Sequence, residues 1–170
     1  GGAIHIEYVD KIETTSCYFH GNTATQYGGS IALSQVRMYY NVLCNFTGDS
    51  AKRDGGSIRL ENLAYSIFNR TIFYKSMSNW GGALNVHLCT VIFITKCKFV
   101  NNSIAYVGGP GSLMLLSAAS TLITESIFKN SLGSLGGAIY GARLSSNVSI
   151  SSTTFLNNKA FASGGALYIF

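Results

Sequence analysis

Few residues of this chain could carry acid–base chemistry, and their relative positions determine what they could do together. The acidic side chains are Glu7, Asp10, Glu13, Asp49, Asp54, Glu61 and Glu125. Two carboxyl groups several ångströms apart can hydrolyse a glycosidic bond, with one group acting as acid and the other as base. Such a pair needs backbone elements that hold both side chains on one face of the fold.

A glycine pair followed by a small and then an aliphatic residue recurs about every 27 residues. The clear copies begin at Gly1, Gly28, Gly55, Gly81, Gly136 and Gly164. A second landmark, a Cys, Ser or Thr two places before a phenylalanine, keeps the same period. It marks Phe19, Phe46, Phe73, Phe99, Phe128 and Phe155. Two landmarks with one period indicate a repeat architecture.

One unit is longer than the others. It begins at Gly108-Gly109, and Pro110-Gly111 reads as an insertion before Ser112. Because proline removes a backbone donor from a strand, we expect a bulge at this point.

The composition of the repeat favours strands over helices. Gly, Ser, Thr, Asn and β-branched residues dominate, and stripes of strong helix formers are missing. Apolar residues alternate locally, as at Ile4 and Ile6 or Ile58 and Leu60. Stacking such units places equivalent residues above one another, about 4.8 Å apart. We therefore predict an all-β fold, a right-handed parallel β-helix of about six coils, its hand following from that of parallel crossovers.

The alignment of the coils predicts several columns of equivalent residues. The six phenylalanines form one interior column, and the residues two places earlier form a thinner one beside it. Another wall is lined by Ile4, Ile31, Ile58, Leu84, Leu113, Ile139 and Leu167. Three residues after each phenylalanine, a polar side chain is expected to hydrogen-bond the turn backbone. These residues are Asn22, Asp49, Ser76, Asn102, Ser131 and Asn158.

The same alignment brings the best candidates for chemistry together on an outer face. Glu7, Ser34, Glu61 and His87 share one outward column, and Arg59 lies in the column beside it. Glu7 and Glu61 are two coils apart, roughly 9–10 Å by the strand spacing, which suits an inverting pair only if the side chains lean together. The sequence contains no HExxH, GxSxG, P-loop or dinucleotide-binding pattern. We predict a non-catalytic protein with no metal site and no cofactor, and keep a carbohydrate-active β-helix enzyme fragment as the alternative.

The four cysteines fit neither a zinc pattern nor a disulfide scaffold. Cys17, Cys44 and Cys97 share the interior position before phenylalanine, where cysteine acts as a small hydrophobic residue. Adjacent coils leave a Cys17–Cys44 bridge open, and Cys89–Cys97 is a second possible pairing. Stacked parallel side chains are poorly oriented for a disulfide.

Four sequons, at Asn45, Asn69, Asn101 and Asn147, would accept N-linked glycans in a eukaryotic host. All four asparagines fall outside the core positions of the aligned coil. We therefore keep glycosylation as an expectation for these sites.

The net charge of +5 is spread along the chain, with Lys52-Arg53 and the group Arg70, Lys96 and Lys98 as local concentrations. We interpret these as solvated outer faces, and a weak contact site for anionic glycans at Arg70, Lys96 and Lys98 as the alternative. Nucleic acid is not expected as a partner, because no basic strip interleaved with aromatic residues runs along one face. No apolar run approaches the roughly 18 residues of a membrane span, so the segment is not expected to be membrane-embedded.

The paired motifs GGA(I/L) and FxxN resemble the repeats of the chlamydial polymorphic outer membrane proteins, and similar repeats occur in secreted β-helix proteins of other bacteria and of protists. FxxN is intact at Phe19 to Asn22, Phe99 to Asn102 and Phe155 to Asn158. In the other units Asp49, Ser76 or Ser131 replaces the asparagine. The resemblance implies an extracellular passenger that is displayed on a cell surface, acts in adhesion and carries no catalytic residues.

We therefore expect residues 1–170 to be a single parallel β-helix segment, a fragment of a longer repeat protein. Its role would be structural or adhesive, as an extracellular surface passenger, coat or filament component, with a glycan-binding module as a further alternative. The end strands would expose unpaired backbone groups. Expected partners are further β-helix repeats or identical copies stacked end to end, together with glycans or a host surface.

Overall fold

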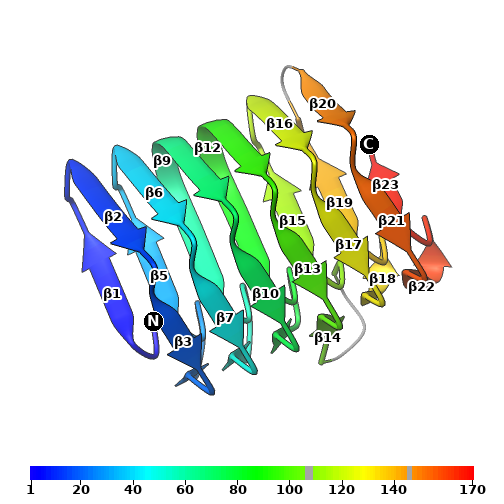
Figure 1. Cartoon of the computed structure of the whole chain (residues 1–170), viewed down its shortest axis with the longest axis horizontal. Helices are drawn as coiled ribbons and strands as arrows, with labels where there is room; N and C mark the ends of the chain where they lie inside the picture. The colour runs from blue at the N-terminus through cyan, green and yellow to red at the C-terminus, as the bar shows by residue number, and fades with distance from the viewer. Residues whose placement is uncertain (106–108, 145–146) are drawn as a thin grey trace.

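The chain forms a parallel β-solenoid, which confirms the predicted fold class. The computed structural model describes residues 1–105, 109–144 and 147–170. In these ranges the chain contains strands and turns and no helix. Figure 1 shows the coils stacked side by side from the N-terminus to the C-terminus, each winding in a right-handed sense.

Each full coil contributes one strand segment to each of four walls. The first wall contains β1 (Ile4–Glu7), β5 (Ile31–Ser34), the first part of β9 (Ile58–Asn69), the first part of β12 (Leu84–Thr95), β15 (Leu113–Leu116), β19 (Ile139–Ala142) and β23 (Leu167–Ile169). The second wall contains β2 (Lys11–Thr15), β6 (Met38–Val42), the later parts of β9 and β12, β16 (Ser120–Thr124) and β20 (Val148–Ser151). Because β9 and β12 run through both walls, these walls form one 11-stranded sheet.

The third and fourth walls are separate six-stranded sheets. The third contains β3 (Tyr18–His20), β7 (Asn45–Thr47), β10 (Ile72–Tyr74), β13 (Lys98–Val100), β17 (Ile127–Lys129) and β21 (Thr154–Leu156). The fourth contains β4 (Thr23–Ala24), β8 (Ser50–Ala51), β11 (Met77–Ser78), β14 (Ser103–Ile104), β18 (Leu132–Leu135) and β22 (Lys159–Ser163).

The six phenylalanines lie in one interior column of the third wall. Consecutive rings are stacked with centroids 4.6–5.2 Å apart. Phe46, Phe73, Phe99 and Phe128 are fully buried, whereas Phe155 in the last coil is only partly buried. Burial of one phenylalanine contributes about 2–3 kcal/mol, so this column is a major source of the stability of the stack.

Three of the six polar residues after the phenylalanines, Asp49, Asn102 and Asn158, bind the backbone of the preceding coil as expected. Asn22, Ser76 and Ser131 bond serine side chains instead. Asn102 accepts from the backbone N–H of Ser76 at 2.9 Å and donates through its amide to the carbonyl of Phe73 at 3.1 Å. Asn158 does the same for the N–H of Ser131 and the carbonyl of Phe128. Each of these two side chains therefore bonds a turn N–H and a strand carbonyl of the preceding coil.

Four corners per coil place the backbone in the left-handed region. All described residues with positive φ fall in four columns, one at each corner. At the corner before the first wall, every described residue with positive φ is a glycine, at Gly28, Gly55, Gly81, Gly136 and Gly164. The corner before the third wall uses Ser16, Leu43, Arg70, Lys96, Glu125 and Ser152. Most corners are therefore imposed by the stack on residues that do not favour this conformation.

The second glycine of each pair that faces a following coil is required for a different reason. A Cβ placed on Gly56 would lie 1.9 Å from the carbonyl oxygen of Gly82 in the next coil. Successive coils thus approach backbone to backbone at this point, which leaves no room for a side chain.

The prediction that Pro110-Gly111 is the insertion was wrong. Leu113 pairs with Leu84, and Gly111 continues the column of second glycines, so Pro110 occupies the place of a first glycine. The additional residues lie between Ile104 and Pro110, and no bulge interrupts β15. Gly108, expected to open this unit, lies outside the described residues. Pro110 stands ahead of β15 and leaves the pairing of that strand intact, but it lacks the N–H that Gly28, Gly55 and Gly136 donate to the next coil at this corner.

All four cysteines are free in the structure. Cys44 and Cys97 are buried in the column before phenylalanine, and the Cys44 thiol contacts the Thr14 carbonyl at 3.4 Å. Neither of the two disulfides that the sequence allowed, Cys17–Cys44 and Cys89–Cys97, is formed. Burial raises the pKa of the Cys97 thiol to about 12, so this group is held in its unreactive form.

Candidate functional site

The outer face of the first wall carries the candidate residues. Glu7, Ser34, Glu61 and His87 pair in successive coils as expected, so they form one column. Arg59 lies in the neighbouring outward column, two residues before Glu61. The strand ladder alone therefore brings these side chains to one face of the solenoid.

Arg59 is the centre of a cluster of charged and aromatic groups. Its Nη1 donates to Oε2 of Glu61 at 2.7 Å, and its Nε lies 3.5 Å from Oδ2 of Asp54. The Tyr27 ring lies against the guanidinium, 4.1 Å from Cζ to the ring centroid. Nδ1 of His87 is 3.6 Å from the other oxygen of Glu61. Arg59 is thus held between two carboxylates and an aromatic face.

The two carboxyl groups of this cluster have opposite pKa shifts. The hydrogen bond from Arg59 lowers the pKa of Glu61, whereas burial raises the pKa of Asp54 in spite of the nearby arginines. Such a division occurs in acid–base enzymes, and it also arises in purely structural ion-pair networks. Asp54 and Glu61 both contact Arg59, which supports a structural ion-pair network as the origin of their pKa shifts.

The carboxylate pair of the enzymatic alternative, Glu7 with Glu61, does not form. Glu7 is exposed and contacts His5 at 3.2 Å, while Glu61 is engaged by Arg59. Ser34 lies between them in the column. Two carboxylates with separate partners cannot act as the leaning pair that inverting hydrolysis requires.

A groove of about 490 Å³ runs along the first wall from this cluster toward the last coil. Its floor is formed by outward residues of β9, β12, β15 and β19, which change from polar near Glu61 to apolar near Tyr140. The groove is lined by Tyr27, Arg53, Asp54, Arg59, Glu61, Trp80, Asn85, His87, Met114, Leu116, Tyr140, Ala142, Arg143 and Phe170. A second hollow, of about 640 Å³, lies over β1 and β5 on the other side of Tyr27 and Arg59.

Sequence reasoning missed Tyr27, Asp54 and Trp80, which form the lip of the groove. They pair with one another as isolated bridges in successive coils. Each stands immediately before a glycine pair, so the signal was present in the printed sequence. The corner that follows each of them turns the chain onto the first wall, where these side chains meet the outward residues of the sheet.

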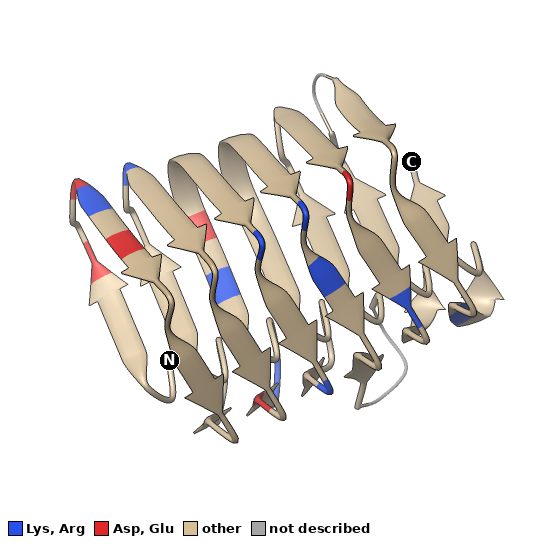
Figure 2. Cartoon of the chain, in the orientation of Figure 1, with Lys and Arg blue, Asp and Glu red and all other residues tan. Residues whose placement is uncertain are grey.

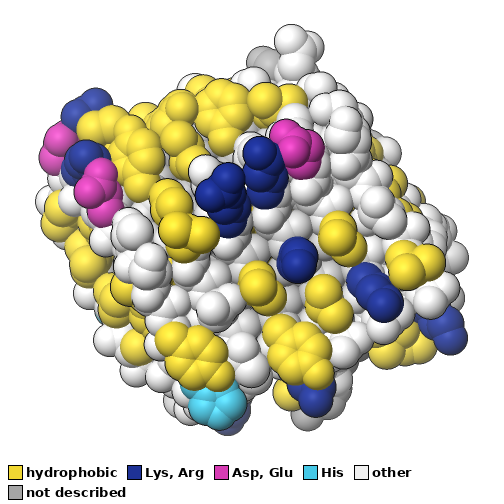
Figure 3. Space-filling view, viewed as in Figure 1, with side chains coloured by type: hydrophobic (Ala, Val, Ile, Leu, Met, Phe, Trp, Pro, Cys, Tyr) yellow, Lys and Arg dark blue, Asp and Glu magenta, His cyan; other side chains and the backbone are white. Residues whose placement is uncertain are grey.

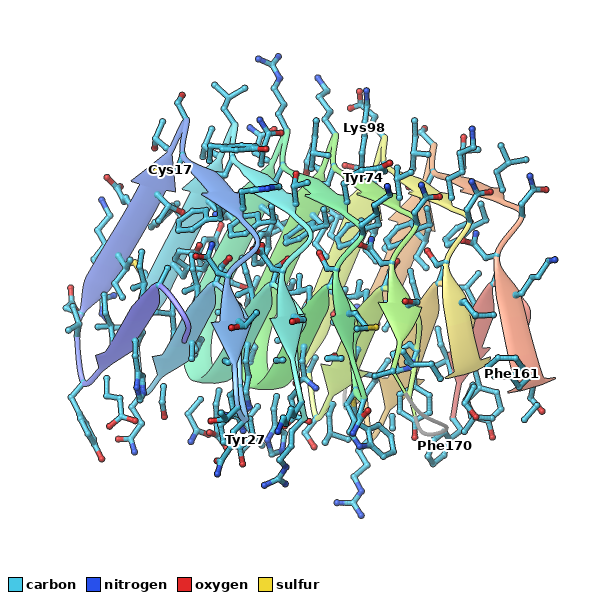
Figure 4. The ribbon with its side chains drawn as sticks, turned by 90° about the horizontal axis from the view of Figure 1, so that it is seen from below. Cys17, Tyr27, Tyr74, Lys98, Phe161 and Phe170 are labelled. Carbon is cyan, nitrogen blue, oxygen red and sulfur yellow. The ribbon has the colours of Figure 1, made fainter. Side chains whose placement is uncertain are left out.

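The basic residues singled out from the sequence lie away from the groove. Arg70 and Lys96 are neighbours at the corner before the third wall, and Nζ of Lys96 is 3.5 Å from Oε2 of Glu125. Lys98 lies on β13. Figure 2 shows the Lys and Arg positions of this side spread over several coils, and Figure 3 shows their side chains spaced among hydrophobic and other side chains. In Figure 4, Lys98 projects from the side of the solenoid opposite to Tyr27 and Phe170.

The four sequon asparagines differ in accessibility. Asn45 and Asn69 are half-buried strand residues, and Oδ1 of Asn69 is buried without a hydrogen-bond partner. Asn101 stands at the corner after the third wall and accepts from the amide of Asn130 at 3.1 Å. Asn147 is exposed. Modification of these residues stays a prediction, with Asn147 the most accessible acceptor.

Among the described residues, no group of three or more His, Cys, Asp or Glu side chains could hold a metal ion. Within the same part of the chain, no helix is long and apolar enough to span a membrane.

Comparison with known proteins identifies one similarity. The family model of the Chlamydia polymorphic membrane protein repeat matches residues 152–169, the coil that contains β21, β22 and β23. No curated protein and no solved structure matches the chain. The resemblance drawn from GGA(I/L) and FxxN is confirmed for this coil. A β-solenoid with repeats of this kind is consistent with a structural role at a cell surface.

Proposed function

We propose that this chain is a non-catalytic segment of an extracellular β-helix that is displayed on a cell surface and takes part in adhesion. The repeated positions of every coil are used for the core, the corners and the polar caps. The outward positions, in contrast, change chemistry from coil to coil, as in the column Glu7, Ser34, Glu61, His87 and Leu116. A regular scaffold with a variable outer surface suits display and contact.

The experiment compares adhesion with catalysis for the same purified protein. Beads coated with the chain should adhere saturably to cultured epithelial cells, and the soluble chain should compete for that adhesion. The same preparation should release no products from neutral or acidic polysaccharides. Turnover that disappears in both Asp54→Asn and Glu61→Gln would overturn the proposal in favour of a carbohydrate-active enzyme.

A weak glycan contact at Arg70, Lys96 and Lys98 is a second candidate function. Within the described ranges, neither Arg70 nor Lys98 forms an ion pair. Arg70 lies beside Lys96 of the adjacent coil, and Lys98 follows Lys96 at the start of the next strand. Binding of a heparin-derived hexasaccharide should be saturable and should weaken with salt. It should fall in Lys96→Ala and Lys98→Ala, and binding that persists in the double variant would exclude this surface.

We also propose that further coils, or identical copies, cover the two ends of the stack. Phe161, Ile169 and Phe170 are exposed large apolar residues of the last coil, with Phe170 68% exposed. The edge strands of the first and last coils leave one side of their backbone ladder open. Sedimentation should show concentration-dependent association of the isolated chain that Phe161→Lys weakens, and a monomer at high concentration would contradict it.

A further inference from the structure

We propose that the groove on the first wall binds a neutral oligosaccharide, with one sugar ring stacked on Trp80 and its hydroxyl groups bonded to Glu61 and His87. This inference goes beyond the proposed surface role, because it assigns a ligand class and a site that are separate from the Arg70, Lys96 and Lys98 surface. Failure of this site would leave that role untouched.

The size and lining of the groove fit a small ligand. Its volume of about 490 Å³ lies within the range of about 300–1,000 Å³ that is typical of small-molecule sites. Apolar floor residues such as Met114, Leu116 and Tyr140 adjoin a compact set of polar groups. A sugar ring likewise combines an apolar C–H face with a polar rim of hydroxyl groups, so it can contact both parts of the groove.

Trp80 offers a fixed aromatic face at the lip of this groove. Its side chain is part of an exposed surface, with 38% of the residue accessible. Its backbone is anchored to the preceding coil, because its N–H donates to the Arg53 carbonyl and its own carbonyl accepts from the N–H of Gly55, each at 2.9 Å. A Cβ on Gly109 would lie 3.0 Å from Cε3 of Trp80, so one edge of the ring packs closely against backbone. A ring held in this way loses little entropy when a ligand stacks on it.

The polar groups beside Trp80 are also oriented before a ligand arrives. Arg59 holds one oxygen of Glu61 at 2.7 Å and keeps the carboxylate ionised, while His87 lies against the other oxygen. The side chains of Glu61 and His87 remain 28% and 32% exposed. An ionised carboxylate accepts hydrogen bonds only, so it selects ligand hydroxyl donors over carboxylate or sulfate groups.

Other ligand classes fit this surface less well. An extended peptide would bind a β-protein by adding a strand to a free edge, but β9, β12 and β15 are each paired on both sides in the floor of the groove. A nucleic acid needs a basic strip, whereas here the arginines are accompanied by Asp54 and Glu61.

The chain contains a single tryptophan, so its fluorescence reports on this groove alone. Cellohexaose, maltohexaose, xylohexaose and chitohexaose are titrated into the protein while Trp80 emission is recorded. We expect a saturable change with at least one of them. Glu61→Gln should raise its Kd about tenfold, the equivalent of one charge-assisted hydrogen bond. The matched control Glu13→Gln, an exposed carboxylate on the second wall, should leave Kd unchanged.

A second measurement does not depend on the fluorophore. By calorimetry, Trp80→Ala should lose binding of the same oligosaccharide and Trp80→Phe should retain part of it, with circular dichroism confirming the fold of each variant. The proposal is overturned if no neutral probe changes the emission, or if Glu61→Gln binds as well as the unaltered chain. An emission change caused only by a heparin-derived hexasaccharide or an acidic peptide would equally overturn it.

Discussion

Replacing Asp49 by asparagine should stabilise the protein. Asp49 is fully buried, and its carboxylate accepts from the N–H of Asn22 at 2.9 Å and from the Ser57 hydroxyl at 3.1 Å. No ion pair to Asp49 forms within the described residues. Burial raises its pKa, so the ionised form is disfavoured in the folded state.

The equivalent residues of two other coils indicate what asparagine would gain. Asn102 and Asn158 accept the same turn N–H and also donate to the phenylalanine carbonyl of the preceding coil, at 3.1 and 2.9 Å. At position 49 that carbonyl belongs to Phe19. Asp49→Asn removes a buried charge and exchanges the oxygen that accepts from Ser57 for this donor, while the Ser57 hydroxyl keeps its contact with the Ser76 hydroxyl at 2.7 Å. We expect a gain of about 1–3 kcal/mol at neutral pH.

Urea unfolding of both proteins at several pH values tests this prediction. Because the folded pKa of Asp49 is raised above its unfolded value of about 3.9, the unaltered chain binds more protons when folded and loses stability as pH rises through the folded pKa. The advantage of Asp49→Asn should therefore be smallest in acid and largest at neutral pH. Asp10→Asn, at an exposed carboxylate, should gain nothing. An equal or lower stability of Asp49→Asn at pH 7, or a difference that does not vary with pH, would refute the reasoning.

Phe73→Ala should cost about 3–5 kcal/mol in the free energy of unfolding, because it opens a cavity between two stacked rings. Phe155→Ala should cost less, since Phe155 is only partly buried, and equal losses in urea unfolding would argue against that ranking. Leu43→Asn should stabilise the chain by about 1 kcal/mol, because Leu43 is 47% exposed and adopts φ 56°, a conformation that asparagine tolerates better. Leu156→Asn, at an exposed strand leucine, is the control and should not stabilise.

Because the sequence repeats with a regular period, the walls of the solenoid could be predicted from it. Phenylalanine and the aliphatic residue after each glycine pair occupy positions where any other chemistry would break the core. Their columns could therefore be aligned with no knowledge of the turns between them. The column Glu7, Ser34, Glu61 and His87 followed from the same alignment.

The corners were predictable only where glycine marks them. Leu43, Lys96 and Glu125 stand at left-handed corners that their residue types do not favour, so local propensity carried no signal. The misplaced insertion has a related cause. Pro110 substitutes for a glycine at a corner, whereas proline was interpreted as an interruption of a strand. Tyr27 and Asp54 were missed for another reason, since they approach Arg59 across a corner rather than along a strand, and only their place before a glycine pair marked them.

The unfavourable corners also explain how this scaffold can vary its surface. A left-handed corner at a residue other than glycine costs about 1–2 kcal/mol, and three of the four corner columns contain such residues. The stacked core and the continuous ladder between coils must offset that cost. Because the stack bears this cost, the residue type at a corner can vary, and the outward positions carry no such requirement. The groove beside Trp80 is a place where several outward positions, contributed by successive coils, meet on one face.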